Sequence, residues 1–219
     1  MEGLSSWWEY VTSNQDMILE ESITHLQVVG ISVGIATVIA VTLAVLVYRN
    51  QLARTVTLSV ASIMLTVPSL ALFAIFIPFT GTGNLPAIIA LVIYAQLPIL
   101  RNTVTGLTGV SPAVVESAKG MGMTSMQQLR KIRLPLALPL ILAGVRISTL
   151  LTVGIAAITV LVGGSGLGEF IRRGITSQGF PFADNAIYTG TFFIILIGLV
   201  LDALLRLVQK LVTPSGLAS

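Results

Sequence analysis

The chain carries no Asp, Glu, Lys or Arg from Thr55 to Leu100. Only 10% of its 219 residues are charged, whereas about a quarter are charged in soluble domains. The mean hydropathy is +0.94, and a soluble protein of this size cannot hide that much apolar surface from water. The surrounding medium is therefore a lipid bilayer, and the predicted fold class is an all-α integral membrane protein.

The apolar segments predict five transmembrane helices. A helix needs about 20 apolar residues to cross the hydrocarbon core, so the segment 55–100 holds two spans with a turn at 80–84 between them. Three further segments complete the set, and the five predicted spans are 25–48, 55–79, 85–100, 139–162 and 186–208. They define a transmembrane domain over residues 25–212, which contains one long polar connection, 111–135, and is followed by a tail, 213–219.

Residues 1–24 have a different composition, with five acidic residues and the aromatic residues Trp7, Trp8 and Tyr10. A signal peptide begins with basic residues, and the first basic residue here is Arg49. We expect an amphipathic helix at the membrane interface, with the aromatic rings at the level of the lipid headgroups. A disordered tail is the alternative interpretation.

Basic residues flank the predicted spans unequally, and this bias predicts the orientation. If the carboxyl terminus is cytoplasmic, only Arg172 and Arg173 are external, and Arg146 lies within a span. Nine basic residues are then cytoplasmic: Arg49, Arg54, Arg101, Lys119, Arg130, Lys131, Arg133, Arg206 and Lys210. The prediction is an external amino-terminal segment, a cytoplasmic 111–135 connection and a cytoplasmic tail.

The 111–135 connection contains signals for two helices. Ser111-Pro112 is typical of a helix start, and Gly120 and Gly122 should end that helix, with Gly122 at a corner that tolerates positive φ. Thr124 and the glutamine three residues later form a capping-box pattern for the second helix. Leu134-Pro135 is expected to redirect the chain into the fourth span, since proline cannot continue a helical hydrogen-bond ladder.

The same connection carries a longer motif, made of Glu116, Ser117, Ala118, Gly122, Ile132, Leu134 and Pro135. The motif resembles the EAA loop of bacterial ABC-transporter permeases, with Ser117 where the family usually has Ala. This resemblance implies a type I ABC importer permease fold with a cytoplasmic coupling loop that docks on an ATPase subunit. It also implies that Glu116 and Ala118 lie at the contact and that Gly122 forms the corner. An amphipathic hairpin at the interface, without a partner, is the alternative.

Other stretches resemble one branch of that family, the permeases for glycine betaine, carnitine, choline or proline betaine. They are Thr66–Ala71, Leu85–Ala90 and Leu100–Thr103. Gly163–Ile171 resembles the external loop of the same branch and of methionine permeases. It lacks the phosphate-loop pattern, so we expect a flexible corner that leads into a short outer helix, Leu167–Ser177.

The resemblance implies several partners in a bacterial plasma membrane. They are an ATP-binding subunit, which would hold ATP and Mg²⁺, a second permease chain, identical or paralogous, and an external substrate-binding protein. A quaternary ammonium ion is best held by aromatic side chains, and both tryptophans precede the predicted spans. High-affinity selection is therefore assigned to the binding protein.

The chain itself shows no pattern for catalysis, cofactor binding or metal binding. It has no cysteine and one histidine, so neither a thiolate metal site nor a Ser-His-Asp set is expected. Its basic residues are scattered, which argues against a nucleic-acid partner. The predicted protein is not an enzyme, and lipid is its immediate environment.

Arg146, Asp202 and Arg206 are charged residues within predicted spans, and His25 stands at the edge of another. Arg146, about 10 Å beyond Pro139 along the fourth span, and Asp202 in the fifth are predicted to form an ion pair near the cytoplasmic side. The alternative is that Arg146 extends to the cytoplasmic interface while Asp202 pairs with Arg206. His25, at the outer edge of the first span, is expected to be an interface residue.

The sequence leaves three functions open. The first is the permease of an osmoprotectant importer, and the second is a permease for methionine or another amino acid. The third is a stand-alone secondary transporter or channel, which predicts intramembrane carboxylates or unwound half-helices. Asp202 is the one such carboxylate in the sequence pattern.

Overall fold

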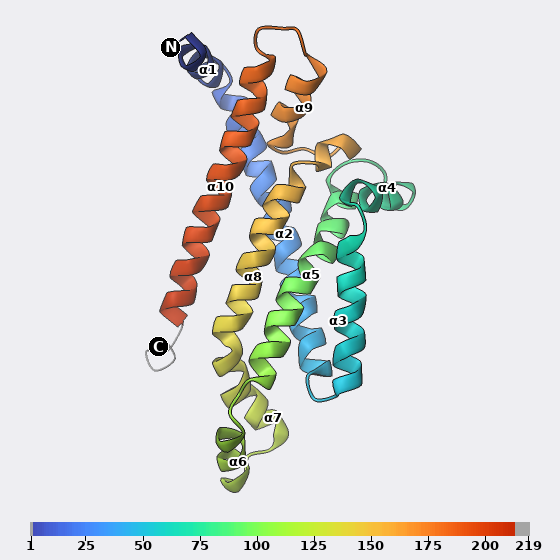
Figure 1. Ribbon diagram of the computed structural model, residues 1–219, viewed down its shortest axis with the longest axis vertical. Coiled ribbons are helices and arrows are strands. Elements are labelled where there is room, and N and C mark those ends of the chain that lie inside the picture. Colours follow the sequence, from blue (N-terminus) through green and yellow to red (C-terminus); the bar gives the residue numbers. More distant parts are fainter. Residues whose placement is uncertain (1, 213–219) are drawn as a thin grey trace.

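The computed structural model describes residues 2–212, with side chains from Leu4 on, and its regular elements are all helices (Figure 1). The tail predicted at 213–219 lies outside the described residues. Long helices lie side by side in an elongated bundle: α2 (Gln15–Val47), α3 (Gln51–Thr66), α5 (Asn84–Thr108), α8 (Leu134–Ala156) and α10 (Ala183–Val212).

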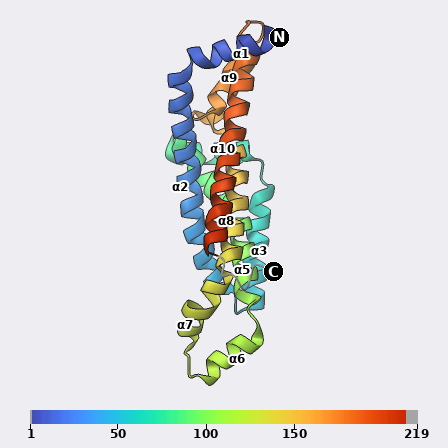
Figure 2. The ribbon, with the colours of Figure 1, turned by 90° about the vertical axis from the view of Figure 1, so that its left-hand side faces the viewer.

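Short helices occupy the two ends of the bundle. At one end, here named the α1 end, lie α1 (Glu2–Ser13) and α9 (Gly168–Thr176), and α1 runs across the axis of α2 (Figure 2). At the other end, here named the α6 end, lie α6 (Pro112–Gly120) and α7 (Ser125–Gln128). The two candidate regions described below lie at these ends.

The apolar helices are long enough to cross a membrane. Four helices are both long and apolar enough to span a bilayer, namely α2, α5, α10 and the continuous helix Ser125–Ala156. The pair α3 and α4 (Ser69–Thr80), bent by 95°, makes a fifth if it is counted as one broken span. The predicted all-α membrane fold is therefore confirmed.

The span predicted over residues 55–79 is interrupted at Val67-Pro68. A residue that precedes proline avoids the α conformation, and Val67 has extended angles, φ −65° and ψ 131°. The break frees the Val67 carbonyl, which accepts a hydrogen bond from the Tyr94 hydroxyl of α5. A broken helix is tolerated at membrane depth when its freed backbone groups find such partners.

The expected change of direction at Leu134-Pro135 is wrong. The chain passes this point within a continuous helix because a π-helical turn, Leu129–Arg133, precedes it. In that turn the Leu134 N–H donates to the Leu129 carbonyl, five residues back. The wider turn leaves room for the ring of Pro135, which has no N–H to contribute. The fourth span consequently starts earlier than residue 139 and ends at Ala156, before a 3₁₀ turn at Thr159–Val162.

Small residues allow the central helices to approach one another closely. Ala36, Ala40 and Ala44 recur every four residues on α2, are fully buried, and belong to the core cluster shared with α5. Between α5 and α8, a Cβ added to Gly144 would lie 2.9 Å from the Pro98 carbonyl oxygen. Such contacts replace the hydrophobic effect as the packing force in lipid.

The amino-terminal helix α1 packs on α10 at the α1 end. The amino-terminal segment is helical, and Trp7 donates from Nε1 to Thr189 Oγ1 of α10 at 3.1 Å. Its ring packs edge-on against Phe192, with centroids 5.4 Å apart.

The expectation of an interface position for His25 is wrong, because His25 is 1% exposed and its Nε2 lies 3.2 Å from the Val153 carbonyl oxygen.

Candidate functional site

The loop at the α6 end starts as the sequence predicts. Ser111 precedes α6, and Pro112 stands at its first position. Within α6, Val115 is buried while Glu116 and Ser117 are exposed to solvent. The short helix therefore exposes Glu116 and Ser117 together with the apolar Val114.

Ala118 packs inside the loop. The resemblance puts it at a contact with another protein, but its side chain is fully buried inside the loop. Its carbonyl accepts the Met123 N–H at 3.1 Å across the turn between α6 and α7. A methyl group fits this interior because the chain folds back on itself there. In the single chain the exposed residues of α6 include Val114, Glu116, Ser117 and Lys119.

The corner after α6 has the hydrogen bonds of a Schellman motif. The Met123 N–H reaches the Ala118 carbonyl, and the Gly122 N–H reaches the Lys119 carbonyl at 2.9 Å. Gly122 has φ +78°, the left-handed conformation that glycine adopts without steric cost. The prediction of positive φ at Gly122 is confirmed, whereas Gly120 continues the helix.

The second helix begins with the predicted capping box. The Gln127 N–H donates to Thr124 Oγ1 at 3.3 Å, and the Thr124 N–H donates to Gln127 Oε1 at 2.8 Å. These reciprocal bonds satisfy two backbone donors at the helix start. Further along, Ile132 and Leu134 are half-buried and Pro135 is exposed, so the motif has one part on α6 and its corner and a second part at the base of α8.

Two arginines tie this loop to the ends of other helices. Arg49 and Arg133 both stack on the ring of Tyr48, with guanidinium carbons 5.4 and 5.6 Å from its centroid. Arg133 Nη1 donates to the Leu107 carbonyl of α5 at 2.6 Å, and Arg49 Nη2 lies 3.5 Å from the Ser125 carbonyl. The loop is thereby joined to α2 and α5 as well as to α8. The charge count singled out these arginines, but nothing in the sequence pairs them with Tyr48.

A charged triad lies between α8 and α10. Arg146 Nε donates to Asp202 Oδ1, and Arg206 Nε donates to Asp202 Oδ2 at 2.7 Å. The structure thus contains both pairings that the sequence offers as alternatives. Gln209 Nε2 also donates to the Pro139 carbonyl at 3.0 Å, which aligns the two antiparallel helices. Arg146 lies seven residues beyond Pro139 on α8, or ~10 Å along the helix.

We expect Asp202→Leu to be more damaging than Arg146→Leu. The first change leaves two cations without a counter-charge, whereas the second leaves the Asp202–Arg206 pair intact. Each unpaired charge at the centre of a bilayer costs about 3 kcal/mol. The yield of folded protein after detergent extraction measures the effect, and the double variant should recover part of the loss of Asp202→Leu. Strictly additive losses would contradict the pairing.

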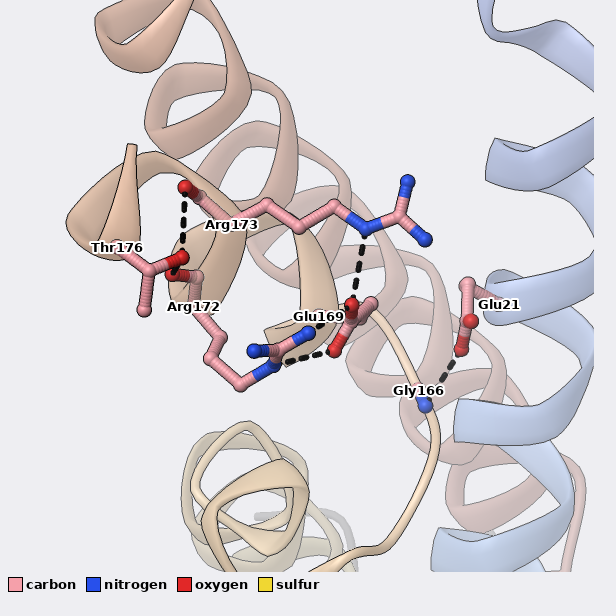
Figure 3. A network of polar contacts seen from close by, with 6 residues as sticks. All are labelled: Glu21, Gly166, Glu169, Arg172, Arg173 and Thr176. Carbon is pink, nitrogen blue, oxygen red and sulfur yellow. Dashed lines mark hydrogen bonds and ion pairs between the residues drawn. The ribbon is translucent and has the colours of Figure 1, made fainter. Parts of the chain in front are cut away.

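At the α1 end, Glu169 of α9 lies between two arginines (Figure 3). Arg172 Nε is 2.7 Å from Oε2, and Arg173 Nε is 2.9 Å from Oε1. The hydrogen bonds from Arg172 lower the pKa of Glu169, partial burial opposes this, and the bond from Arg173 adds to the lowering. All three residues belong to α9, so the ionised cluster stabilises this short outer helix itself, whose bounds are close to the predicted Leu167–Ser177. The helix lies against α10 at Gly174 and Gly190, where an added Cβ would meet atoms of the facing helix at 3.1 Å or less.

The glycine-rich corner before α9 is held by two distant side chains. Glu21 Oε2 of α2 accepts from the Gly166 N–H at 2.6 Å (Figure 3). Asn84 Oδ1 at the start of α5 accepts from the Ser165 N–H at 2.8 Å. Gly166 has φ +136°, and a Cβ there would lie 3.1 Å from His25 Nδ1. Sequence reasoning missed this clasp because no local pattern links α2 to residue 166.

The described residues contain no cluster of His, Cys, Asp and Glu that could hold a metal ion. An apolar groove of about 420 Å³ opens between α2, α3 and α5. Its lining is aliphatic except for Thr57 and Gln96, so it offers no charge to a small ionic solute.

Comparison with known proteins finds one family. Residues 35–214 match the family described as "Binding-protein-dependent transport system inner membrane component". The chain is 37% identical to the glycine betaine/carnitine/choline transport system permease protein OpuCB of Bacillus subtilis, over 95% of this chain and 94% of that protein. It is also 37% identical to the osmoprotectant import permease protein OsmW of Salmonella typhimurium, over 95% and 97% of the two chains.

Solved structures share the fold. A chain of the MetNI methionine ABC transporter in an inward-facing conformation superposes with a TM-score of 0.81 at 24% identity, covering 92% of this chain and 99% of that one. An amino acid ABC transporter gives a TM-score of 0.74 at 18% identity, covering 92% and 96%. At these identities the likeness concerns the fold alone.

Proposed function

This chain belongs to the binding-protein-dependent transport system inner membrane component family, and on that premise we propose that it is the permease of an ATP-driven importer for quaternary-ammonium osmoprotectants. Relatives of nearly equal length, named as glycine betaine, carnitine and choline permeases, support this substrate class. Permeases of this kind are non-catalytic membrane components, so ATP and Mg²⁺ are handled by a separate ATPase subunit.

The observation that carries the proposal is the exposed face of α6 on a rigid support. The Schellman corner and the capping box join α6 to α7, and the arginine pair on Tyr48 joins α7 and the start of α8 to the ends of α2 and α5. We assign Glu116 and Ser117 to the contact with the ATPase subunit. Ala118 and Gly122 shape the loop behind that contact, and Ile132, Leu134 and Pro135 connect it to the fourth span.

In this mechanism the assembly contains two permease chains, identical or paralogous, because five spans are too few to enclose a path. ATP binding draws the two ATPase subunits together, and each pulls the α6 seated on it. The rigid supports transmit this displacement to α2, α5 and α8, which opens the path toward the external binding protein. Hydrolysis of ATP returns the helices to the inward-facing arrangement.

The α6 end is cytoplasmic and the amino terminus is external in this proposal. The distribution of basic residues supports this orientation, with Arg49 and Arg133 at the α6 end. In that orientation the Glu169 cluster and the glycine-rich corner face the external binding protein.

The orientation predicts which introduced cysteines react in whole cells. The chain has no cysteine of its own, so single replacements report their own positions. Ser13→Cys in α1 should react with a membrane-impermeant thiol reagent, and Ser125→Cys in α7 should react only after the cells are opened, because both side chains are exposed at opposite ends. The reverse pattern would refute the topology.

Uptake should depend on the external binding protein. Vesicles that contain this chain, its partner permease if there is one, and the ATPase subunit should take up labelled glycine betaine, carnitine or choline with ATP only when that protein is present. Omission of ATP serves as the control. Uptake of methionine, with none of these solutes carried, would favour the amino-acid branch.

A further inference from the structure

A pocket of about 280 Å³ opens at the α1 end, between α1 and the chain segment that enters α10. One wall is formed by Ser6, Glu9, Tyr10 and Ser13. Their spacing of three or four residues places these side chains on a single face of the helix. The opposite wall includes Phe182, directly before α10. The volume is near the lower end of the range for ligand pockets, about 300 Å³, so the pocket is wide enough for one small solute.

Aromatic rings stand on both sides of this pocket. Tyr10 belongs to α1 and Phe182 to the connection between α9 and α10. The ring of Phe180 stacks on that of Phe182, with centroids 5.7 Å apart and an interplanar angle of 28°. The face of an aromatic ring attracts cations, and quaternary ammonium groups are recognised in this way.

Glu9 supplies a carboxylate to the same pocket. It is exposed, and its carboxylate forms no hydrogen bond or ion pair in the described part of the chain. Among the described residues, none of those that line the pocket is basic. Partial burial raises the pKa of Tyr10, and the charge of Arg173 opposes this rise. That charge is offset by Glu169, which lies 2.9 Å from Arg173 Nε.

The surroundings of the pocket carry an excess of negative charge. Between residues 4 and 24 and between 163 and 190 there are two basic residues, Arg172 and Arg173, and both are bound to Glu169. The same two segments contain six acidic residues: Glu9, Asp16, Glu20, Glu21, Glu169 and Asp184. An uncompensated charge of one sign raises the local concentration of ions of the opposite sign. The α1 end therefore favours cations over anions.

We propose that this pocket binds the trimethylammonium group of a small solute, with the rings of Tyr10 and Phe182 against its methyl groups and Glu9 as its counter-charge. A trimethylammonium group has no N–H to donate, so ring faces and a nearby carboxylate suit it better than a set of hydrogen-bond acceptors. The inference rests on the proposed function for the choice of solutes, since glycine betaine, carnitine and choline share this group and methionine lacks it. The permease then holds a weak site of its own, apart from the external binding protein.

The test measures how far a solute protects a cysteine in the pocket. The complete importer with Ser13→Cys in the permease is placed in vesicles of phosphatidylethanolamine and phosphatidylglycerol. A small neutral methanethiosulfonate modifies this cysteine, the only one in the chain. Millimolar choline or glycine betaine should slow the modification in a saturable manner. The neutral isostere of choline, with carbon in place of nitrogen, should not. Gln178→Cys, exposed at the same end but outside the pocket, should show no protection.

Substitutions in the walls assign the protection to the pocket. Phe182→Leu and Glu9→Gln should each raise the choline concentration for half-protection about fivefold, the change that corresponds to one exposed cation–π or ionic contact. Glu9→Gln keeps the shape of an exposed side chain, so it tests the site even if Phe182→Leu does not fold. Tyr188→Leu is the matched control, because Tyr188 is 59% exposed on α10 and lies outside the pocket. Unchanged protection in both wall variants would overturn the proposal.

The remaining outcomes separate this site from a lipid site and from the proposed function. Equal protection by choline and its neutral isostere, or no protection by any trimethylammonium solute, would overturn the site. Protection that appears only when phosphatidylcholine enters the vesicles would do the same, because the pocket would then take a lipid headgroup. Protection requires neither ATP nor uptake. An importer that choline protects but that carries no such solute would contradict the function and keep the site, whereas uptake without protection would contradict the site alone.

Discussion

Glu116→Lys is expected to abolish ATP-driven uptake by separating the permease from its ATPase subunit. Glu116 is exposed on α6 and forms no hydrogen bond or ion pair within the described residues, so its replacement leaves the fold intact. An acidic residue at an interface is matched by positive charge on the partner, so Lys at position 116 would face a like charge. Such a contact costs several kcal/mol, which corresponds to a loss of affinity of at least tenfold. Co-purification of the ATPase subunit with tagged permease measures this loss directly.

The matched control is Glu9→Lys, the same charge reversal at an exposed position of α1. It should leave the ATPase subunit bound, because it lies at the opposite end of the bundle. Gly122→Leu tests the corner through the backbone alone, because a residue with a side chain is destabilised by about 1–2 kcal/mol at positive φ. Gly120→Leu is the control, because Gly120 does not have a positive φ. Normal ATPase binding and uptake in both Glu116→Lys and Gly122→Leu would remove the coupling role from this loop.

Gly144→Leu is expected to cause the largest loss of folded protein. Even a Cβ at this position would lie 2.9 Å from Asn102 Cβ and from the Pro98 carbonyl oxygen, and 3.0 Å from the Ile99 Cα. Two of these atoms belong to the backbone of α5 and cannot move aside alone, so α8 must shift. Overpacking of a tight contact costs about 3 kcal/mol, which thermal unfolding in detergent should show as a large decrease in stability.

Gly154→Leu provides the control on the same helix. A Cβ at Gly154 meets nothing within 4 Å, and the gain in helix propensity is the same for both substitutions. The difference between the two variants thus isolates the contact between α5 and α8. Equal stability of the two variants would show that the α5–α8 contact is not tightly packed in the membrane.

Two prolines show why the positions of the spans could be predicted better than their shape. Hydropathy alone locates the apolar segments, because the bilayer sets the required length. Yet Pro68 interrupts its helix and Pro135 does not. The outcome depends on remote partners in one case and on a π-helical turn in the other: the Tyr94 hydroxyl stabilises the bend at Val67, and the Leu134–Leu129 bond carries the chain past Pro135. Tyr94 is remote from Pro68 in the sequence, and the π-helical turn directly precedes Pro135 but no residue pattern predicts it.

Some features of the candidate site follow from neighbouring residues, and others depend on contacts between residues distant in the sequence. The corner at Gly122 and the capping box at Thr124 follow from residues a few positions apart, so the sequence pattern predicts them. The burial of Ala118 and of His25, by contrast, follows from how the chain folds back. The clasp between Glu21 and Gly166 joins residues 145 positions apart, and no periodicity in a single sequence reports such a contact.

The docking of α1 on α10 gives the chain an order of assembly. Trp7 bonds a hydroxyl 182 residues further along the sequence, so its partner enters the membrane only when the last helix does. Until then the indole N–H and the aromatic face of α1 have no counterpart on the protein. Contacts between the two ends of a chain form late, after the intervening segments are ordered. The indole of Trp7 thereby becomes a marker of completed insertion, and its environment distinguishes a finished subunit from one that stops short of its final span.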